Sequence, residues 1–255
     1  MAMGLRPLDL ANWLEVDDQR DEELALKSSL LSEKRNVVVG LREEGLAGSK
    51  ELLEEVVLSL SRHHAMLPTE VDESDHPLVS AARLVQEDLC VLVKSDTWRL
   101  LAACVCFPSR WNLASKIGTT IDEIHSPVPL YDEKLSSPTN AFFDRMTSEK
   151  AVWRLNWTLI DNKDLHQPTS ARQSPQGDLS KWFFRVERQT LRQLPRSGAI
   201  IFTIRNYVAS ARELYERDAE FGPTLLRSLE TAPEEMQAYK GWLGVAERLR
   251  DSLSS

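Results

Sequence analysis

The stretch from Cys106 to Pro129 concentrates residue types that could do chemistry. It contains Cys106-Phe-Pro-Ser-Arg-Trp111, then Lys116-Ile-Gly118, then Ile124-His-Ser-Pro-Val-Pro129, and His125 is its only histidine. Pro127 and Pro129 each fix their own φ and push the preceding residue toward extended conformations, so we expect the imidazole on a stiff segment. A stiff carrier suits an imidazole that must hold one orientation, as a metal ligand does. A second interpretation is a ring that bonds a backbone carbonyl in a turn.

Composition limits the classes of function. The chain has 255 residues and a formal net charge of -8, enough length for a sizeable core without disulfides. The acidic balance disfavours a broad phosphate-binding surface, so nucleic acid is not an expected partner. No apolar run approaches the roughly 20 residues that span a bilayer, and the first ten residues lack the features of a secretory signal. We therefore expect a cytoplasmic protein with no membrane association.

Cysteine usage points the same way. Cys90, Cys104 and Cys106 are an odd number without paired spacing, which argues against a disulfide framework, a zinc ribbon or a covalently attached haem. We expect buried, reduced thiols.

The spacing of apolar residues predicts helices, then strands, then helices. Helices are expected over residues 22–35, 49–66 and 75–85, with Ser49 and Asp75 as N-caps. Strands are expected over residues 89–93, 98–107, 152–160, 182–189 and 198–208, the first two joined by a hairpin turn. Residues 112–146 should form short helices and turns that cover a pocket, and residues 162–179 a polar loop. Helices are expected again over residues 210–217, 222–230 and 234–253.

Charged side chains on three of these strands need partners. Alternation places Arg154 beside Asn156 on one face of its strand, and Arg185 beside Glu187 on one face of another. Arg205 lies in a strand that is otherwise almost wholly apolar, so it requires a carboxylate, a propionate or a ligand oxygen. A solvated face or a structural ion pair is the alternative for each arginine.

Six motifs occur in a specific order. They are Cys106-Phe-Pro-Ser-x-Trp111, Lys116-x-Gly118, Ile124-His-x-Pro-Val-Pro129, Arg154-x-Asn-Trp157, Arg185-Val-Glu-Arg-Gln-Thr-Leu-Arg-x-Leu-Pro195 and Phe202-Thr-Ile-Arg205. This series resembles the haem-dependent oxidative N-demethylases, relatives of the dimethylamine monooxygenase haem subunit. It spans roughly residues 84–205, and Tyr239-Lys-Gly241 fits the pattern more loosely.

The resemblance implies a haem b, with its iron, held in a PAS-like domain. Such a domain is an antiparallel sheet of about five strands with helical additions, which agrees with the strands expected above. We therefore expect an α+β fold in one domain, residues 1–255, with a helical part at 1–86, a sheet core at 87–208 and a helical part at 209–255.

The implied chemistry is reductive activation of O2 at haem and oxidation of an N-methyl group on a small secondary amine such as dimethylamine, with release of formaldehyde. His125 is the implied proximal ligand of the iron. The expected cofactor-binding residues are His125, Arg154, Arg188, Lys116 and Trp111, and the expected catalytic residues are Arg205 and Glu187. Glu187 would anchor the amine or relay protons, or else it forms a structural pair with Arg185 or Arg205.

The electrons for this reaction would come from outside the chain. The sequence has no G-x-G-x-x-G dinucleotide loop and no four-cysteine iron–sulfur pattern, so we expect a separate flavin or iron–sulfur reductase as a partner.

Three alternatives stay open. A PAS-like haem protein could sense O2 or redox state instead of turning over substrate. A haem-free descendant could keep the fold as an interaction module. Cys104 or Cys106 could offer a thiolate to the iron in place of the imidazole.

Overall fold

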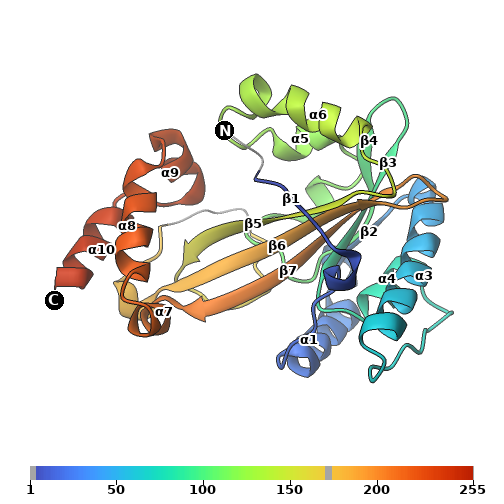
Figure 1. The fold of residues 1–255 in the computed structure, drawn as a ribbon, viewed down its shortest axis with the longest axis horizontal. Helices are drawn as coiled ribbons and strands as arrows, with labels where there is room; N and C mark the ends of the chain where they lie inside the picture. Colours follow the sequence, from blue (N-terminus) through green and yellow to red (C-terminus); the bar gives the residue numbers. More distant parts are fainter. Residues whose placement is uncertain (1–3, 170–173, 255) are drawn as a thin grey trace.

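An antiparallel sheet of seven strands, in the order β1-β5-β6-β7-β3-β4-β2, organises the molecule (Figure 1). The computed structural model describes residues 4–169 and 174–254. The strands are β1 Arg6–Pro7, β2 Val39–Leu41, β3 Asp88–Lys94, β4 Trp98–Cys104, β5 Ala151–Ile160, β6 Phe183–Gln193 and β7 Ile200–Ser210.

Ten α-helices are found among the described residues. They are α1 Arg20–Glu33, α2 Arg35–Val38, α3 Leu46–His63, α4 Pro77–Ala82, α5 Ile121–His125, α6 Ser136–Asp144, α7 Ala211–Arg217, α8 Phe221–Thr231, α9 Glu234–Lys240 and α10 Val245–Ser254. Four 3-10 turns, Leu10–Asn12, Glu43–Gly45, Leu113–Ser115 and Leu179–Lys181, and one π-helical turn, Tyr131–Leu135, complete the regular elements. None of the helices in these described residues is long and apolar enough to cross a membrane.

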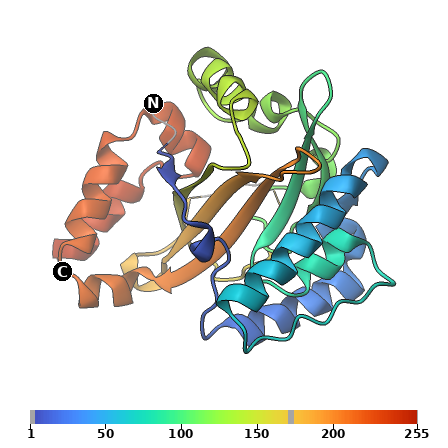
Figure 2. The same ribbon diagram turned by 45° about the vertical axis from the view of Figure 1, so that its right-hand side comes forward.

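The two faces of the sheet carry different cores. β5, β6 and β7 pair in unbroken register, with Arg188 opposite Arg205 and Glu187 opposite Asn206, so alternate residues point to opposite faces. We call the face of Arg188 and Arg205 the α1 face, because α1, α3 and α4 lie against it. We call the face of Glu187 the α5 face, because α5 and α6 lie against it (Figures 1 and 2).

Apolar packing holds each layer in place. On the α1 face, Leu52 of α3 and Leu78 of α4 are buried in one cluster with Leu89 and Ile201 of the sheet. On the α5 face, a second cluster joins Ile121, Phe143 and Met146 to buried residues of β3, β4 and β7. A third cluster packs the C-terminal helices α8 and α10 against the ends of β5 and β6. Full burial of one such aliphatic or aromatic side chain stabilises the fold by about 1.5–3 kcal/mol.

The expected α+β class is confirmed as a mixture of helices and an open antiparallel sheet, but the strand count was wrong. The sheet has seven strands instead of about five. The two strands that were missed, β1 and β2, contain two and three residues and lie at opposite edges of the sheet. Both come from residues 1–86, the part expected to be helical. Segments this short carry no period-2 pattern that could have revealed them.

Two predicted helix caps were wrong. α3 begins at Leu46, and Ser49 lies inside it with its hydroxyl donating to Gly45 O at 2.8 Å. At the start of α4, the cap is His76, whose Nδ1 accepts from the Leu78 amide at 3.3 Å. Asp75 pairs with Arg35 instead.

One predicted strand ends earlier than expected, and one predicted helix is divided in two. β4 stops at Cys104, because the amides of Cys106 and Phe107 donate to the carboxylate of Asp88 at 2.8 and 3.0 Å in place of a neighbouring strand. The helix expected over residues 234–253 is divided by Gly241 and Gly244, each with φ +71°. This left-handed conformation ends a helix and is readily adopted by glycine. Residues 170–173 of the expected polar loop lie outside the described residues.

Candidate functional site

His125 is the last residue of α5, a short helix fixed at its start. Thr120 Oγ1 accepts from the Glu123 amide at 3.1 Å, and Glu123 Oε2 accepts from the Thr120 amide at 2.7 Å. This reciprocal capping box satisfies two backbone donors that the first turn leaves free. The helix therefore holds His125 in one place between its cap and the prolines that follow.

The two nitrogens of the His125 ring have different roles. Nδ1 lies 2.8 Å from Ile121 O, and because a carbonyl only accepts, Nδ1 must carry the proton and Nε2 the lone pair. Burial lowers the pKa of His125. The hydrogen bond to Ile121 raises this pKa, whereas the charges of Arg154 and Lys116 lower it further. The ring is thus neutral at pH 7, and it stacks on Tyr131 with centroids 5.1 Å apart. Both interpretations of this histidine are compatible, since the carbonyl takes Nδ1 and a metal would take Nε2.

Arg154 of β5 is a partly buried cation on the α5 face. Its Nε donates to Gln189 Oε1 at 2.8 Å. Burial lowers the pKa of Arg154, while the negative charge of Glu187 opposes this effect. Among the residues that the structure describes, no carboxylate lies within ion-pair distance of its guanidinium. An anionic group brought beside Arg154 would therefore be stabilised.

Lys116 and Trp111 lie on the same side of the sheet. Lys116 Nζ donates at 2.9 Å to the carbonyl of Ile124, the residue before His125. Trp111 is partly buried against the apolar cluster of the α5 face. The structure thus gathers His125, Lys116 and Arg154 into one neighbourhood, in which two cations act on a neutral imidazole.

Glu187 lies on the α5 face, in a chain of side-chain hydrogen bonds. Its Oε2 accepts from Asn156 Nδ2 at 3.1 Å and from Gln189 Nε2 at 2.8 Å. The ion pair considered with Arg185 or Arg205 is not formed. Arg185 instead donates to Asn206 Oδ1 at 2.9 Å and to Phe107 O at 2.7 Å.

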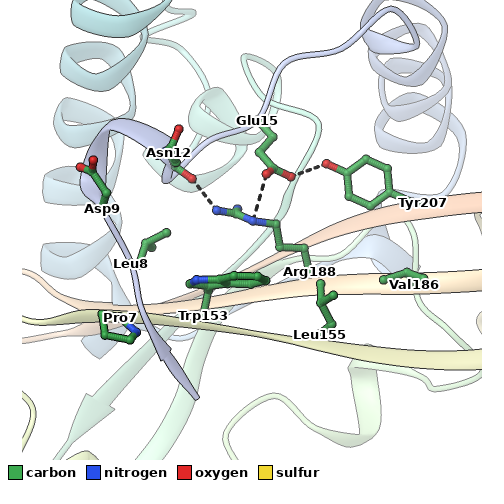
Figure 3. Close-up of a pocket in the computed structure, with 10 residues that line it drawn as sticks. All are labelled: Pro7, Leu8, Asp9, Asn12, Glu15, Trp153, Leu155, Val186, Arg188 and Tyr207. Atoms are coloured by element: carbon green, nitrogen blue, oxygen red, sulfur yellow. Dashed lines mark hydrogen bonds and ion pairs between the residues drawn. The ribbon is translucent and has the colours of Figure 1, made fainter. Parts of the chain in front are cut away.

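Arg188 lies on the α1 face, across the sheet from His125. It lines a groove of about 650 Å³ between the N-terminal segment and β5, β6 and β7 (Figure 3). Its three guanidinium nitrogens bond Asn12 O, Trp13 O and the carboxylate of Glu15. Glu15 also accepts a hydrogen bond from the hydroxyl of Tyr207. Arg188 and Glu15, which both line this groove, therefore form an ion pair with each other.

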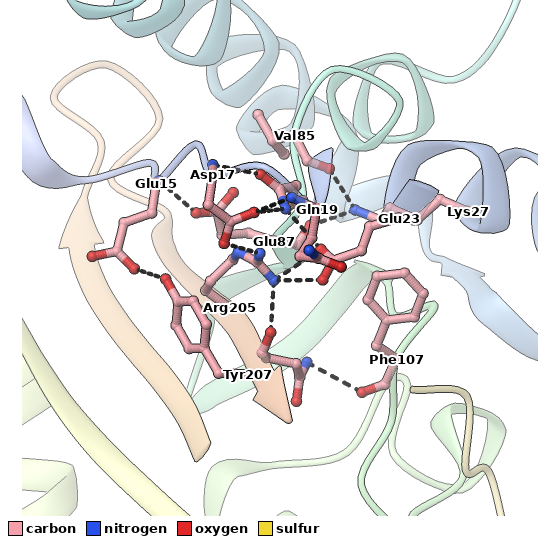
Figure 4. A network of polar contacts seen from close by, with 12 residues as sticks. Glu15, Asp17, Gln19, Glu23, Lys27, Val85, Glu87, Phe107, Arg205 and Tyr207 are labelled. Atoms are coloured by element: carbon pink, nitrogen blue, oxygen red, sulfur yellow. Dashed lines mark hydrogen bonds and ion pairs between the residues drawn. The ribbon is translucent and has the colours of Figure 1, made fainter. Parts of the chain in front are cut away.

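Arg205 is also on the α1 face, and its partners are the carboxylates that its strand requires. Nη2 lies 2.6 Å from Asp17 Oδ2 and Nη1 lies 2.8 Å from Glu23 Oε2 (Figure 4). Burial alone would lower the pKa of Arg205, but the charges of Glu23 and Asp17 outweigh it and raise that pKa. This ion-pair cluster fastens the N-terminal segment and α1 to β7.

The cysteines are buried and free. The pKa of the Cys106 thiol is raised by its hydrogen bond with Cys104 and by burial, and burial likewise raises the pKa of Cys90. These two thiols stay protonated at pH 7, which opposes the thiolate alternative for Cys106. Within the described part of the chain, no group of three or more His, Cys, Asp and Glu residues is arranged to hold a metal ion.

Three further residues, which were not among those expected from the sequence, join this site. Asn156 and Gln189 bond Glu187 directly, and Lys240 bonds Asn156 at 3.0 Å. Strand alternation had already placed Asn156 beside Arg154. The signal for Lys240 was its position in Tyr239-Lys-Gly241, although its contact with β5 spans 84 positions of the sequence.

The fold and the site define a class of mixed helix-and-sheet protein in which one face of the sheet holds a neutral, metal-competent histidine beside two cations. The family model described as haem-dependent oxidative N-demethylase, alpha subunit-like, matches residues 63–250. The chain belongs to this family.

Proposed function

We propose that this chain binds haem b against the α5 face, with His125 Nε2 as the protein ligand of the iron. The observation that carries this proposal is the Nδ1 hydrogen bond to Ile121 O at 2.8 Å, which leaves a neutral ring with a lone pair on Nε2. Haem would bring its own porphyrin ligands to the iron, so a single histidine, His125, would suffice as the protein ligand.

The charges around His125 fit the same cofactor. Arg154 is a partly buried cation that gains from an anion, and Lys116 reinforces it. We assign both residues to the haem propionates. The guanidinium of Arg154 is permanently charged and the side chain of Lys116 is flexible, and both properties suit the binding of carboxylates. Trp111 would contribute apolar surface. Arg188 and Arg205 lie on the opposite face with carboxylate partners of their own, so we assign them to holding the N-terminal segment.

The reaction that the family name supports is oxidative N-demethylation. Bound haem would supply the reduction of O2 and the oxidation of the methyl group: dimethylamine, O2, two electrons and two protons would give methylamine, formaldehyde and water. We assign Glu187 to the amine. Its Oε2 is held by two amides, and a carboxylate oxygen can accept from an alkylammonium or take a proton from it.

The type of domain, the electron donor and the cellular location are part of the same proposal. The five long strands form an antiparallel sheet whose first and last members, β3 and β7, are neighbours, and this supports a PAS-like single domain. We infer an external flavin or iron–sulfur reductase as the electron donor and a cytoplasmic location, both from the sequence.

The test is turnover by haem-loaded protein with dimethylamine, O2 and a flavin or iron–sulfur reductase, with formaldehyde as the measured product. We expect formaldehyde to form with the amine and to be absent without it. Glu187→Gln should keep the haem spectrum and lower kcat/KM at least about tenfold, because it replaces a charged acceptor. Haem binding without amine-dependent formaldehyde would overturn the demethylase assignment and leave an O2 or redox sensor.

A further inference from the structure

Lys240 lies at the far end of the hydrogen-bond chain that reaches Glu187. Its Nζ donates to Asn156 Oδ1 at 3.0 Å and to Trp157 O at 2.6 Å. An ammonium can only donate, so Asn156 must turn its oxygen toward Lys240 and its NH2 group toward Glu187. The orientation of this amide is therefore set by a residue of the C-terminal helices.

The opposite end of the chain follows the same logic. The Nε–H of Arg154 can also only donate, so Gln189 presents its oxygen to Arg154 and its NH2 group to Glu187. Both amides thereby donate to the same atom, Glu187 Oε2. Two cations at the ends fix two amides between them, and together they fix the direction of one carboxylate.

Three local features hold Lys240 in position. α9 ends at Lys240, and Gly241 follows in the left-handed conformation with φ +71°. This turn brings Trp242 onto Trp157 of β5, with ring centroids 4.6 Å apart. The ammonium of Lys240 then lies 5.0 Å from the centroid of Trp242, within cation–π range.

We propose that Lys240 is a positioning residue for Glu187, through which the C-terminal helices take part in the site. It acts through Asn156 and does not itself contact the amine substrate. The expected effect of Lys240 on amine turnover rests on the proposed function of Glu187. The effect of Lys240 on the orientation of Asn156 does not depend on that function.

The orientation can be tested in haem-free protein by NMR of the side-chain amides. We expect Lys240→Met to shift the Asn156 amide resonance and to speed its exchange with solvent about tenfold, since a hydrogen bond to a charged group is lost. Lys240→Arg retains a permanent donor and should largely restore the resonance. If Lys240→Met does not fold, Lys240→Gln can be used instead. The glutamine amide both donates and accepts hydrogen bonds, so it would not fix the orientation of the Asn156 amide.

Arg248→Met is the matched control. Arg248 is another cation of the C-terminal helices, 5.8 Å from the Trp182 ring and bonded to Pro175 O. We expect this variant to leave the Asn156 amide unchanged. An unchanged Asn156 amide in Lys240→Met, or an equal change in Arg248→Met, would overturn the positioning role.

Turnover of the haem-loaded variants separates this role from the proposed function. We expect kcat/KM for the amine to fall about tenfold in Lys240→Met and to recover in Lys240→Arg, at matched melting temperatures. If the NMR change is found while wild-type protein oxidises no amine, the demethylase function fails and the positioning role stands. If wild-type protein turns over while Lys240→Met keeps both its amide signal and its kcat/KM, the positioning role fails alone.

Discussion

At the scale of single residues, the site depends on which atom of each side chain is already engaged. His125 and His166 illustrate this, because each bonds a backbone carbonyl through Nδ1, at 2.8 Å in both cases. Only His125 lies beside the two cations Lys116 and Arg154, whose charges help to keep its ring neutral. The hydrogen bond alone therefore does not separate the two histidines, and our proposal of His125 as the metal ligand rests on the surrounding charges as well.

The two faces of the sheet provide a prediction about two arginines, Arg154 of β5 and Arg188 of β6, that the sequence had grouped together. We expect Arg154→Gln to weaken haem affinity about tenfold, because it removes a partly buried cation from the α5 face. Arg188→Lys changes an arginine on the α1 face and should leave haem affinity unchanged. Haem titration of both variants measures this, and an equal loss in the two would refute the assignment of faces.

Part of this geometry could be read from the sequence. Glu187 and Arg188 are consecutive residues of one strand, so alternation alone places them on opposite faces. Glu187 and Arg188 were nevertheless both expected in the same site, which their alternation along the strand opposes. The neighbourhood of Lys116 and His125 could not be derived, since it depends on how a segment of turns and short helices folds over the sheet.

At the scale of elements, the long segments were predictable and the short ones were not. All five predicted strands occur, and each has at least seven residues, which is long enough for an apolar or alternating pattern to show in the sequence. β1 and β2 exist only because β5 and β4 offer them an edge. α3 follows directly on a 3-10 turn and begins after Gly45, which has no side chain to act as a cap, whereas at the start of α4 His76 takes the role expected of Asp75.

The N-terminal segment before α1 is held to the sheet by Asp17 and Arg205. Burial would raise the pKa of Asp17, but the hydrogen bond from Gln86 and the charge of Arg205 together hold it below 3.8. Its contribution to stability is therefore present above about pH 4 and is lost as the pH falls through the lower pKa of the folded state.

We expect Asp17→Asn to lower the free energy of unfolding by about 1–2 kcal/mol at pH 7 and by much less at pH 3. Asp18→Asn is the control, because Asp18 is exposed and bonds only Gln19. Urea unfolding at the two pH values measures the difference. A pH-independent loss, or an equal loss in Asp18→Asn, would contradict this account of the segment.

At the scale of the whole molecule, the sheet separates two tasks. Its α1 face binds the N-terminal segment and helices through apolar packing and through the ion pairs of Arg188 and Arg205. Its α5 face carries the proposed haem site, and the C-terminal helices reach that face through Lys240. Removal of haem should therefore abolish turnover while the α1-face packing is retained.

Haem ligation by His125 can be tested by an absorption titration with haem, before and after dithionite and CO. We predict a Soret band that saturates at one haem per chain and shifts with CO in wild-type protein and in His166→Ala. In His125→Ala the band should be lost, or should change to that of a different ligand field. A featureless titration of wild-type protein, or an unchanged spectrum in His125→Ala, would contradict haem ligation by His125.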